Sequence, residues 1–520
     1  MTAQSFPWLT GLIVLPFVGA LVVWALPGAA RRWARHVGVG VSLATLVLAV
    51  LAVVAFDLGD AGTVQLTEQA SWIPAIGASY AVGVTGIGLA LILLSVLLVP
   101  LVLLAAWREH PEAASDGTRA RDYVALILVL EALMVAVFAA RDVFLFYVLF
   151  EAMLVPVYFM IGMFGGAQRR YAAMKFLLYS LAGGLIMLAG VIVLYAHGPR
   201  GPQGFLVDAL VGAEMGTWTE RLVFLSFFIA FAIKAPMWPV HTWLPDATEQ
   251  APAGTNVLLV GVLDKVGTFG MLTLCLPLFP AASQWAAPVI IVLAVISILY
   301  GALLAIGQED LMRLIGYTSI SHFGFIVLGI FAFTSVGVQG ASLYMLTHGL
   351  STGALFLAAG FLVARWGTAR IPVYGGLQRA VPVLAGTFLV AGLSALSLPG
   401  LAPFVSELLV FVGTYQAVPA AAVVATLGVV LAALYVLITY QRVFTGAPRT
   451  PLATRADLSV RERWVIGPLI AAMLVLGLLP APMIDLVRDP AERAVTELTA
   501  ATDTDADTVD VAGPDEGSDS

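Results

Sequence analysis

The chain has 520 residues, of which 60% are hydrophobic and 11% are charged, and its formal net charge at pH 7 is -7. A soluble protein of this length has no way to shield so much apolar side chain from water, so the composition excludes a soluble enzyme and predicts a membrane protein. The single cysteine, Cys275, excludes a disulfide framework and a cysteine-ligated iron–sulfur cluster within this chain.

Apolar runs of roughly 18 to 25 residues recur along the whole chain, and each is long enough to cross a ~30 Å hydrocarbon core as a helix. We count about fourteen of them, so we expect an all-α integral membrane protein with about 14 transmembrane helices. The first run, from Trp8 to Leu26, lacks a basic leader and a small-residue cleavage site, which predicts a retained helix and not a signal peptide.

The predicted helices divide the chain into five segments. Helices 1 to 3 occupy residues 1–121, helices 4 to 8 occupy 122–275, and helices 9 to 13 occupy 286–444. A connector and helix 14 follow in 445–490. The last segment, 491–520, is polar, acidic and almost free of large apolar side chains, so we expect it to be disordered.

The second and third segments carry a faint repeat. Residues 174–190 and 344–360 align without gaps and share Gly183/Gly353, Leu185/Leu355, Ala189/Ala359 and Gly190/Gly360. The same offset brings a proline-interrupted run after Lys234 close to another before Glu407. An odd number of helices per repeat inverts the second repeat, so we expect two inverted five-helix repeats with broken helices 7 and 12.

The arginines predict the orientation of the helices. Of the 22 arginines, 17 lie in six alternate connectors, namely 27–36, 107–121, 165–172, 307–313, 365–380 and 441–463. The positive-inside rule places these connectors in the cytoplasm and both termini outside, which is consistent with an even number of spans.

The three lysines are distributed differently. Lys175, Lys234 and Lys265 all lie inside predicted membrane helices, whereas arginine supplies every other basic position. A desolvated lysine amine can release its proton, whereas a guanidinium effectively cannot. Snorkelling to the interface or a fixed ion pair is the alternative for any one lysine, but the shared placement of all three favours titratable groups.

Other ionisable side chains also lie within apolar runs. A charge at mid-bilayer costs about 2.5 to 3.5 kcal/mol on insertion scales, so each of these groups needs a partner or a water-filled cavity. These further candidates for a functional role are Glu131, Glu151, Asp264, His322, His348 and Glu407. A structural role is the alternative, since an intramembrane histidine also stabilises packing by hydrogen-bonding a neighbouring helix.

Polar residues at helix junctions favour simpler roles. Arg141 and Asp142 fit a local interface pair, and the polar residues of 309–313, in a predicted cytoplasmic turn, fit helix capping. For Asp246, turn formation or capping is at least as good an interpretation as proton chemistry.

Two predicted helices are interrupted by prolines. In FAIKAPMWPVHTWLPDA (231–247) the prolines directly follow Lys234, and in LSLPGLAPFVSE (396–407) they precede Glu407. Backbone groups freed by such breaks need water or side chains, as in the discontinuous helices of secondary transporters. A nearby glutamate and lysine then act as a switch, since the lysine holds its proton while the glutamate is close and releases it when the glutamate is withdrawn. Together these features predict a proton wire.

The motifs at these positions are long and specific. KAPMWPVHTWLPDA (234–247) resembles the K-x-P-x-x-P-x-H-x-W-L-P-D-A signature of the antiporter-like subunits of proton-pumping NADH:quinone oxidoreductase (respiratory complex I), and GQEDLMRLIGYTSISHFGF (307–325) resembles their second hallmark. Relatives occur in multi-subunit cation/proton antiporters and membrane-bound hydrogenases. The resemblance covers roughly residues 120–445, and LFYVLFEAMLVPVYFMIG and LPGLAPFVSE are most similar to the subunit M type.

The resemblance implies a proton relay made of Glu151, Lys234, Lys265, His322, His348 and Glu407, with Glu131, His241 and Asp264 as secondary candidates. In this assignment the glutamate of the fifth helix pairs with the lysine of the broken seventh. The lysine of the eighth helix and the histidines of the tenth and eleventh form the central relay. The glutamate of the broken twelfth helix is the terminal carboxylate near the periplasmic exit.

The same resemblance implies a translocase subunit that binds no redox cofactor and no metal. NADH, flavin, iron–sulfur clusters and quinone are expected in partner subunits, where quinone reduction drives pumping. The expected partners are other membrane subunits, notably two homologous antiporter-like subunits, and the lipid of a bacterial plasma (inner) membrane; no nucleic acid is expected.

Three residues depart from the family pattern. Thr248 and Gln250 stand where the family usually has a histidine and a glutamate, which puts a proton-collecting role of that loop in doubt. Asp264 directly before Lys265 is unusual for the family. Adjacent helical residues point about 100° apart, so Asp264 is expected to face a neighbouring helix and not to neutralise the lysine directly.

Two other functions compete with a respiratory proton pump. One is a subunit of a multi-subunit Na+/H+ antiporter or a membrane-bound hydrogenase, which the neighbouring genes would distinguish. The other is a purely structural subunit with relic polar residues, which the separation of lysine from arginine disfavours, because an idle position has no need to remain lysine.

Overall fold

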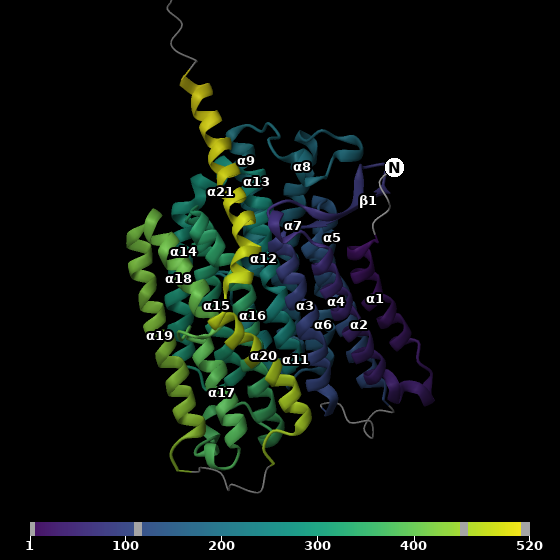
Figure 1. Ribbon diagram of the computed structural model, residues 1–520, viewed down its shortest axis with the longest axis vertical. Coiled ribbons are helices and arrows are strands. Elements are labelled where there is room, and N and C mark those ends of the chain that lie inside the picture. The colour runs from purple at the N-terminus through teal and green to yellow at the C-terminus, as the bar shows by residue number, and fades with distance from the viewer. Residues whose placement is uncertain (1–5, 109–116, 448–455, 511–520) are drawn as a thin grey trace, which may run out of the picture.

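The structure is a computed structural model that describes residues 6–108, 117–447 and 456–510, and its helices pack side by side into one elongated bundle (Figure 1). The helices up to residue 197 are α1 (Trp8–Trp24), α2 (Ala34–Ala55), α3 (Gly86–Ala105), α4 (Thr118–Ala139), α5 (Val143–Ala152), α6 (Leu154–Phe164) and α7 (Arg169–His197). Those that follow the breaks and turns discussed below include α14 (Pro280–Ile306), α15 (Leu311–Phe331), α16 (Ser335–Trp366), α19 (Pro419–Phe444) and α20 (Val460–Leu478).

The helices of the described ranges are those of a multi-pass membrane protein. Ten of them are long and apolar enough to cross a membrane, or up to 11 if the bent pair that ends the described chain is one span. The predicted all-helical membrane class is therefore confirmed, while the count of fourteen and the inversion of the repeats stay predictions. Helices α4 and α14 begin a few residues before the predicted segment starts at 122 and 286. For α14 the cause is Pro280, whose fixed φ suits the first helical position.

The bundle has an interior and a lipid-like exterior. The central helix α15 is buried along its whole length, and α16 is buried along most of it. By contrast, α7, α14 and α19 expose large apolar side chains such as Leu178, Val289 and Val430. Such a surface is stable in hydrocarbon and not in water. Polar groups on α15 and α16 are thereby held away from lipid.

An antiparallel pair of strands, β1 (Gln65–Ile73) and β2 (Ala78–Val84), follows α2 and was not predicted from the sequence. Gly77, with φ of +73°, lies in the turn between them, a conformation that favours glycine. Glu68 on β1 accepts hydrogen bonds from the backbone N–H groups of Leu9 and Thr10, at 2.8 Å and 3.2 Å. The hairpin thus caps the positive N-terminal end of α1.

The first predicted break lies between α9 (Thr217–Lys234) and α10 (Trp243–Gln250). Pro236 and Pro239 lack backbone donors and therefore end the helix. The freed groups find side-chain partners, since the Trp243 indole donates to the Ile233 carbonyl at 2.9 Å and the Trp238 N–H donates to the Ser297 hydroxyl at 2.9 Å. The break is therefore a stable feature of the fold.

The second predicted break lies between α17 (Pro382–Ala395) and α18 (Ala402–Ala417). Ser397 and Gly400 both adopt positive φ there, at 58° and 91°. Gly400 meets this demand without strain because it has no Cβ, and its carbonyl packs directly against Gly477 on α20. A non-glycine residue such as Ser397 at positive φ is uncommon and marks a constrained position.

The helical span that follows α10 is interrupted by wider π-helical turns. It consists of α11 (Ala253–Leu258), the π-turn η6 (Leu259–Leu263), α12 (Lys265–Gly270), the π-turn η7 (Met271–Cys275) and α13 (Leu276–Leu278). Such π-turns are rare and occur frequently at functional sites. Lys265, a predicted relay residue, directly follows the first π-turn and Asp264.

The chain after α20 bends by 71° into α21 (Ala481–Asp510), which rises along the bundle and projects beyond it (Figure 1). The prediction that 491–520 is disordered is therefore wrong for 491–510, and 511–520 lies outside the described residues. The reason is packing, because Leu486, Val487, Ala491 and Leu498 form an apolar stripe at helical spacing that is buried against the bundle.

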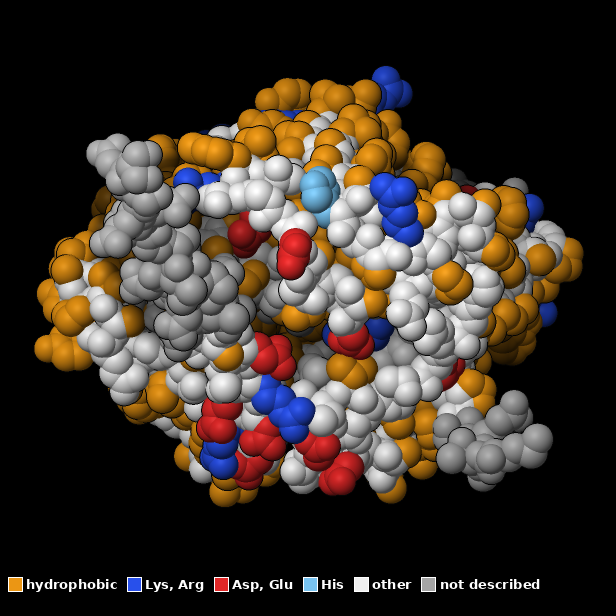
Figure 2. All heavy atoms as spheres, turned by 90° about the horizontal axis from the view of Figure 1, so that it is seen from above, with side chains coloured by type: hydrophobic (Ala, Val, Ile, Leu, Met, Phe, Trp, Pro, Cys, Tyr) orange, Lys and Arg blue, Asp and Glu red, His pale blue; other side chains and the backbone are white. Residues whose placement is uncertain are grey.

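The hairpin, α8 (Val207–Leu210) and the far part of α21 lie at one end of the bundle (Figure 1). Seen from that end, acidic and basic side chains gather around a hollow, and apolar side chains surround them at the margin (Figure 2). Two ion pairs tie the elements here: Arg493 to Asp60 at 2.7 Å, and Arg141 to Asp208. The predicted pair of Arg141 with Asp142 is therefore wrong, because Arg141 pairs with Asp208. Asp142 caps α5 instead, since its carboxylate accepts from the Leu145 N–H.

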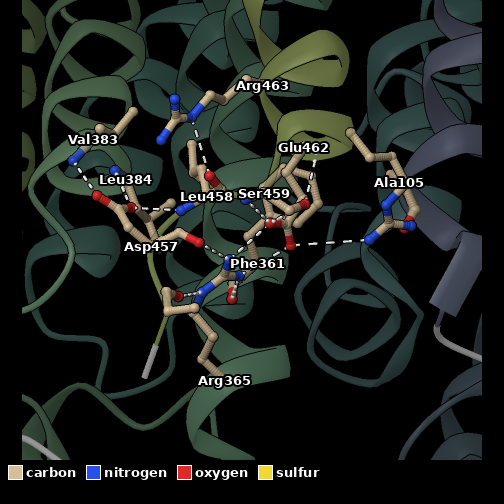
Figure 3. A network of polar contacts seen from close by, with 12 residues as sticks. Ala105, Phe361, Arg365, Val383, Leu384, Asp457, Leu458, Ser459, Glu462 and Arg463 are labelled. Carbon is tan, nitrogen blue, oxygen red and sulfur yellow. Dashed lines mark hydrogen bonds and ion pairs between the residues drawn. The ribbon is translucent and has the colours of Figure 1, made fainter. Parts of the chain in front are cut away.

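Figure 3 shows a polar network in which Arg365, in the last turn of α16, plays the central part. Its guanidinium donates to both carboxylate oxygens of Glu462, at 2.7 Å and 3.1 Å, and to the carbonyls of Ala456 and Asp457. Glu462 also accepts from the Ser459 N–H at 2.7 Å, which completes a capping box at the start of α20.

The same network reaches two more helix ends. The Asp457 carboxylate accepts from the N–H groups of Val383 and Leu384, at 2.7 Å and 3.0 Å, in the first turn of α17. Arg461 donates to the carbonyls of Leu104 and Ala105 at the end of α3. The network thus ties together α3, α16, α17 and α20. Carboxylates lie at the N-terminal ends of α17 and α20 and guanidinium groups at the C-terminal ends of α3 and α16, where the helix dipole favours each charge.

Replacing Arg365 by methionine keeps most of the volume but removes the cation that bonds both oxygens of the nearly buried Glu462 carboxylate and leaves it only the more distant Arg461, at 4.0 Å. Breaking a buried ion pair on one side costs about 3 to 5 kcal/mol, so we expect a clearly lower unfolding midpoint of the purified protein in detergent. Arg370→Met is the matched control. Its pair with Glu309 is 65% and 59% exposed, and exposed pairs contribute little. Equal midpoints for the two variants would show that the network does not hold the helices.

Candidate functional site

Helices α12, α15, α16 and α18 bring together a row of buried polar side chains that we call the central chain: Lys265, His348, His322, Tyr344 and Glu407. The Lys265 Nζ lies 2.9 Å from His348 Nδ1, and His322 Nδ1 lies 2.7 Å from the Tyr344 hydroxyl. Tyr344 donates to Glu407 Oε2 at 2.7 Å. All five side chains are buried. Four predicted relay residues thus form two hydrogen-bonded groups, Lys265 with His348, and His322 with Glu407 through Tyr344, a residue that was not predicted.

The sequence did contain a signal for Tyr344. It precedes His348 by four residues on α16, and residues at this spacing lie one above the other on the same helix face. A buried tyrosine hydroxyl next to an intramembrane histidine and a buried glutamate can donate to one and accept from the other. The imidazole rings of His322 and His348 lie 5.1 Å apart between centroids, and the described structure contains no hydrogen bond between them.

The Glu407 end of the chain is built from the second helix break. Ser397, in the break itself, donates a hydrogen bond to Glu407 Oε2, the same oxygen that Tyr344 contacts. Tyr435 on α19 lies 3.3 Å from His322 Nε2. Neither Ser397 nor Tyr435 was predicted. The positive φ at Ser397 directs its hydroxyl to a carboxylate that would otherwise be poorly satisfied.

The Lys265 end of the chain is built from the π-turn. Besides His348, the Lys265 ammonium donates to the backbone carbonyl of Val260 at 2.6 Å. Val260 lies within η6, where the wider winding disturbs the regular i to i−4 ladder and allows a side chain to reach a carbonyl. The ring of Phe323 lies 5.2 Å from the ammonium and adds a cation–π contact.

Lys234 and Glu151 differ from the central chain because they make no direct ion pair. The Lys234 Nζ is fully buried at the end of α9 and has no hydrogen-bond partner in the described structure. The rings of Phe150 and Phe176 lie 5.1 Å and 5.7 Å from it. Glu151, on α5, interacts with Lys234 electrostatically, and its Oε1 is also buried without a partner. The predicted pair is therefore an electrostatic one, separated in space.

Gly184 on α7 makes room for the Glu151 carboxylate. A Cβ at this position would lie 1.7 Å from Glu151 Oε1, so any other residue would displace the carboxylate. The close approach explains why a glycine is tolerated in the middle of this helix.

The three secondary candidates are buried and incompletely satisfied. Asp264 and Glu131 are fully buried, and in the described structure neither carboxylate oxygen of either residue has a hydrogen-bond partner. Asp264 interacts electrostatically with Lys234 and Lys265. His241 lies beside the first break with its Nδ1 unpartnered and its ring 5.2 Å from that of Tyr300.

A cluster of ion pairs joins the two predicted repeats, and sequence reasoning missed it. Asp246 on α10 accepts from Lys175 on α7 and from Arg313 on α15, both at 2.6 Å, and Arg313 also contacts Glu249 at 2.9 Å. The prediction that Lys175 is a titratable residue of the membrane interior is wrong, because it lies in a fixed, partly exposed ion pair. Arg313, for which capping was predicted, instead forms ion pairs, and Asp246, for which both capping and proton chemistry were open, lies in the first turn of α10 and takes part in two ion pairs of this cluster. Only Asp310 caps a helix here, since it accepts from the N–H groups of Met312 and Arg313.

The two loop departures have structural roles. The Gln250 side chain accepts from the Gln168 N–H at 2.8 Å, and its carbonyl accepts from the Gly166 N–H at 2.8 Å, so it holds the connector before α7. Thr248 is fully buried and packs on Gly316 of α15. Neither residue replaces the acid–base groups that the family pattern has at these positions.

The central chain is suited to proton transfer because donors and acceptors alternate along it. An amine, two imidazoles, a phenol and a carboxyl can each hold or release a proton. Among the described residues, no group of three or more histidine, cysteine, aspartate and glutamate side chains could hold a metal ion.

The chain is similar to known proteins over most of its length. The family model described as NADH:quinone oxidoreductase/Mrp antiporter, TM matches residues 140–434. NADH-quinone oxidoreductase subunit M of Mycobacterium tuberculosis is 46% identical over 95% of both chains, and the protein of the same name from Rhodobacter capsulatus is 39% identical over 88% of this chain and 90% of its own.

Solved structures give the same result for the fold. A chain of respiratory complex I from Thermus thermophilus with bound NADH has a TM-score of 0.83 at 31% identity, covering 94% of this chain and 99% of that one. A chain of the Mrp complex from Dietzia also reaches 0.83, at 22% identity, over 94% and 99%. The resemblance predicted from the two motifs is confirmed, and the chain belongs to the NADH:quinone oxidoreductase/Mrp antiporter family of membrane proteins.

Proposed function

We propose that this chain is the proton-translocating subunit M of an NADH:quinone oxidoreductase. The relatives that carry this name are similar over almost the whole chain. The antiporter alternative receives less support, since the Mrp chain is only 22% identical and that likeness extends to the fold alone. The observation that carries the proposal is the buried central chain, in which an amine and a carboxyl lie at the two ends of a row of groups that all transfer protons, hydrogen-bonded except between the two histidine rings, which lie 5.1 Å apart.

The step at Tyr344 follows from its two hydrogen bonds. While Tyr344 donates to Glu407, its oxygen can accept from His322 Nδ1. When His322 is an imidazolium and Glu407 a carboxylate, the His322 proton can therefore move to Tyr344 as the Tyr344 proton moves to Glu407. The His322 N–H and the original Tyr344 O–H bonds break, a new Tyr344 O–H and a Glu407 O–H bond form, and all three groups end neutral. Short hydrogen bonds of this kind are the geometry that proton transfer requires.

The histidine pair is the control point of the chain. Lys265 can pass a proton to His348 Nδ1 directly, but His348 Nε2 is buried and has no partner in the described structure. Transfer from His348 to His322 therefore needs one ring to reorient or a water to bridge the two rings. This gap allows the complex to hold a proton on one side and release it when the connection forms.

Glu151 and Lys234 form the switch that feeds this chain. Because no hydrogen bond fixes the Lys234 ammonium, its charge depends on the field of Glu151 and the neighbouring rings. When the Glu151 carboxylate moves away or gains a proton, Lys234 loses the negative charge that stabilises its ammonium. Desolvation then drives Lys234 to release its proton.

The remaining predictions complete the proposal. Quinone reduction in partner subunits supplies the energy, and this chain itself binds no redox cofactor. The neighbours are homologous antiporter-like subunits in a bacterial plasma membrane, with both termini outside. The multi-pass apolar helices and the arginine-rich alternate connectors support this orientation.

Lys234→Ala in the assembled complex should abolish proton uptake into inverted vesicles that is coupled to NADH oxidation. Lys234→Arg should impair it as strongly, because a guanidinium retains its proton. Assembly is checked by subunit content and by NADH oxidation with an artificial electron acceptor. Normal pumping in the arginine variant would contradict a titratable lysine.

Tyr344→Phe removes only the hydroxyl that links His322 to Glu407. We expect proton uptake to fall by at least about tenfold, since a positioned proton-transfer group typically contributes about 10²- to 10⁴-fold. The matched control is Tyr123→Phe. It deletes a buried hydroxyl that lies outside the central chain and is hydrogen-bonded to the Thr255 hydroxyl at a distance of 3.0 Å. If both variants pump equally well, the path does not pass through Tyr344.

A further inference from the structure

The hydrogen-bonded central chain stops at Lys265, and nothing in the described structure connects it by a hydrogen bond to Lys234. The two lysines end one helix and begin another, since Lys234 closes α9 and Lys265 opens α12. A path that uses both lysines needs a group between them. Asp264 is the ionisable residue that interacts electrostatically with both.

Close packing of α12 on α9 positions Asp264. A Cβ on Gly267 would lie 2.5 Å from the Phe231 carbonyl oxygen and 2.7 Å from the Ala235 nitrogen, so this face of α12 touches the last turn of α9. Asp264 precedes Gly267 by three residues and shares its face. Its side chain is therefore directed toward the turn that carries Lys234.

Lys265 points elsewhere because adjacent helical residues diverge by about 100°. Its ammonium reaches Val260 and His348, on the side of α16. Asp264 thus faces α9, which carries Lys234, whereas Lys265 faces α16, which carries His348. The sequence-based expectation that Asp264 faces a neighbouring helix agrees with this arrangement.

The surroundings of Asp264 do not satisfy a permanent charge. The residue is fully buried, and both of its carboxylate oxygens lack hydrogen-bond partners in the described structure. A buried carboxylate without hydrogen bonds is costly unless it is protonated or near a cation. Asp264 interacts electrostatically with Lys234 and Lys265 but forms a hydrogen bond with neither in the described structure. This arrangement suits a group that alternates between a carboxylate and a carboxylic acid.

We infer that Asp264 is a further proton-transfer residue that carries protons from Lys234 to Lys265. This inference deepens the proposed function and rests on it. In the first step a Lys234 N–H bond breaks and an Asp264 O–H bond forms, leaving a neutral amine and a carboxylic acid. In the second step Asp264 gives this proton to Lys265, which has already passed its own to His348, and returns to a carboxylate.

The test uses the assembled complex with Asp264→Asn, Asp264→Glu and Lys234→Ala. Asparagine has nearly the same shape but cannot carry the proton, so coupled proton uptake should fall about tenfold or more. Glutamate restores a carboxyl and should recover most of the rate. Thr268→Val is the control on the same helix, because it deletes a buried hydroxyl that bonds the Lys265 carbonyl and Met345. Redox-triggered infrared difference spectra should also show a carboxylic-acid C=O band that Asp264→Asn removes.

The outcomes separate the inference from the function on which it rests. Loss in Asp264→Asn with recovery in Asp264→Glu and loss of the infrared band supports the relay. If Lys234→Ala stops pumping but Asp264→Asn pumps normally, the relay is overturned and the proposed function stands. If Asp264→Asn impairs pumping but the carboxylic-acid C=O band seen in the unmodified complex persists in this variant, Asp264 has a structural role and the relay is likewise overturned. If neither Lys234→Ala nor Asp264→Asn affects pumping, the proposed function fails as well.

Discussion

The structure depends on one constraint: inside a bilayer there is no water to satisfy a polar group, so the protein must satisfy it. Along the central chain this is largely achieved, because Lys265 bonds His348 at 2.9 Å and Tyr344 bonds both His322 and Glu407 at 2.7 Å, although the buried His348 Nε2 has no partner in the described structure. In the other half it is not. Lys234, Glu151 and Asp264 keep buried polar atoms without partners in the described structure. The molecule therefore combines an ordered conduit with a set of groups whose charge is easily changed.

The irregular backbone serves the same constraint. The first break exposes the Ile233 carbonyl, which the Trp243 indole satisfies, and the π-turn leaves the Val260 carbonyl to Lys265. The second break places the Ser397 hydroxyl on Glu407. Each departure from a regular helix thus creates or orients a polar contact that a regular helix would not offer. A rigid polar network at the helix ends and the cluster around Asp246 keep these irregular segments in place.

Sequence reasoning predicted what depends on local chemistry. Prolines within apolar runs located both breaks, and the cost of charge in hydrocarbon identified the buried ionisable residues. It missed contacts that depend on which helices become neighbours. Tyr344 in the central chain and Ser397, which bonds Glu407 at its end, have ordinary polar side chains, which apolar periodicity does not single out. The ion-pair partner of Lys175, Asp246, lies on α10, so this fixed ion pair was visible only in three dimensions. The terminal helix was mistaken for a disordered tail because composition outweighed a sparse apolar stripe.

The central claim is that protons cross this subunit through the chain that ends at Glu407. The most direct measurement is the number of protons taken up per NADH oxidised by inverted vesicles that contain the complex with Glu407→Gln, a change that keeps the shape and removes the titratable carboxyl. The account predicts that fewer protons are taken up per NADH, or that coupled turnover stops altogether in a fully assembled complex. An unchanged proton count at an unchanged rate of NADH oxidation would contradict it.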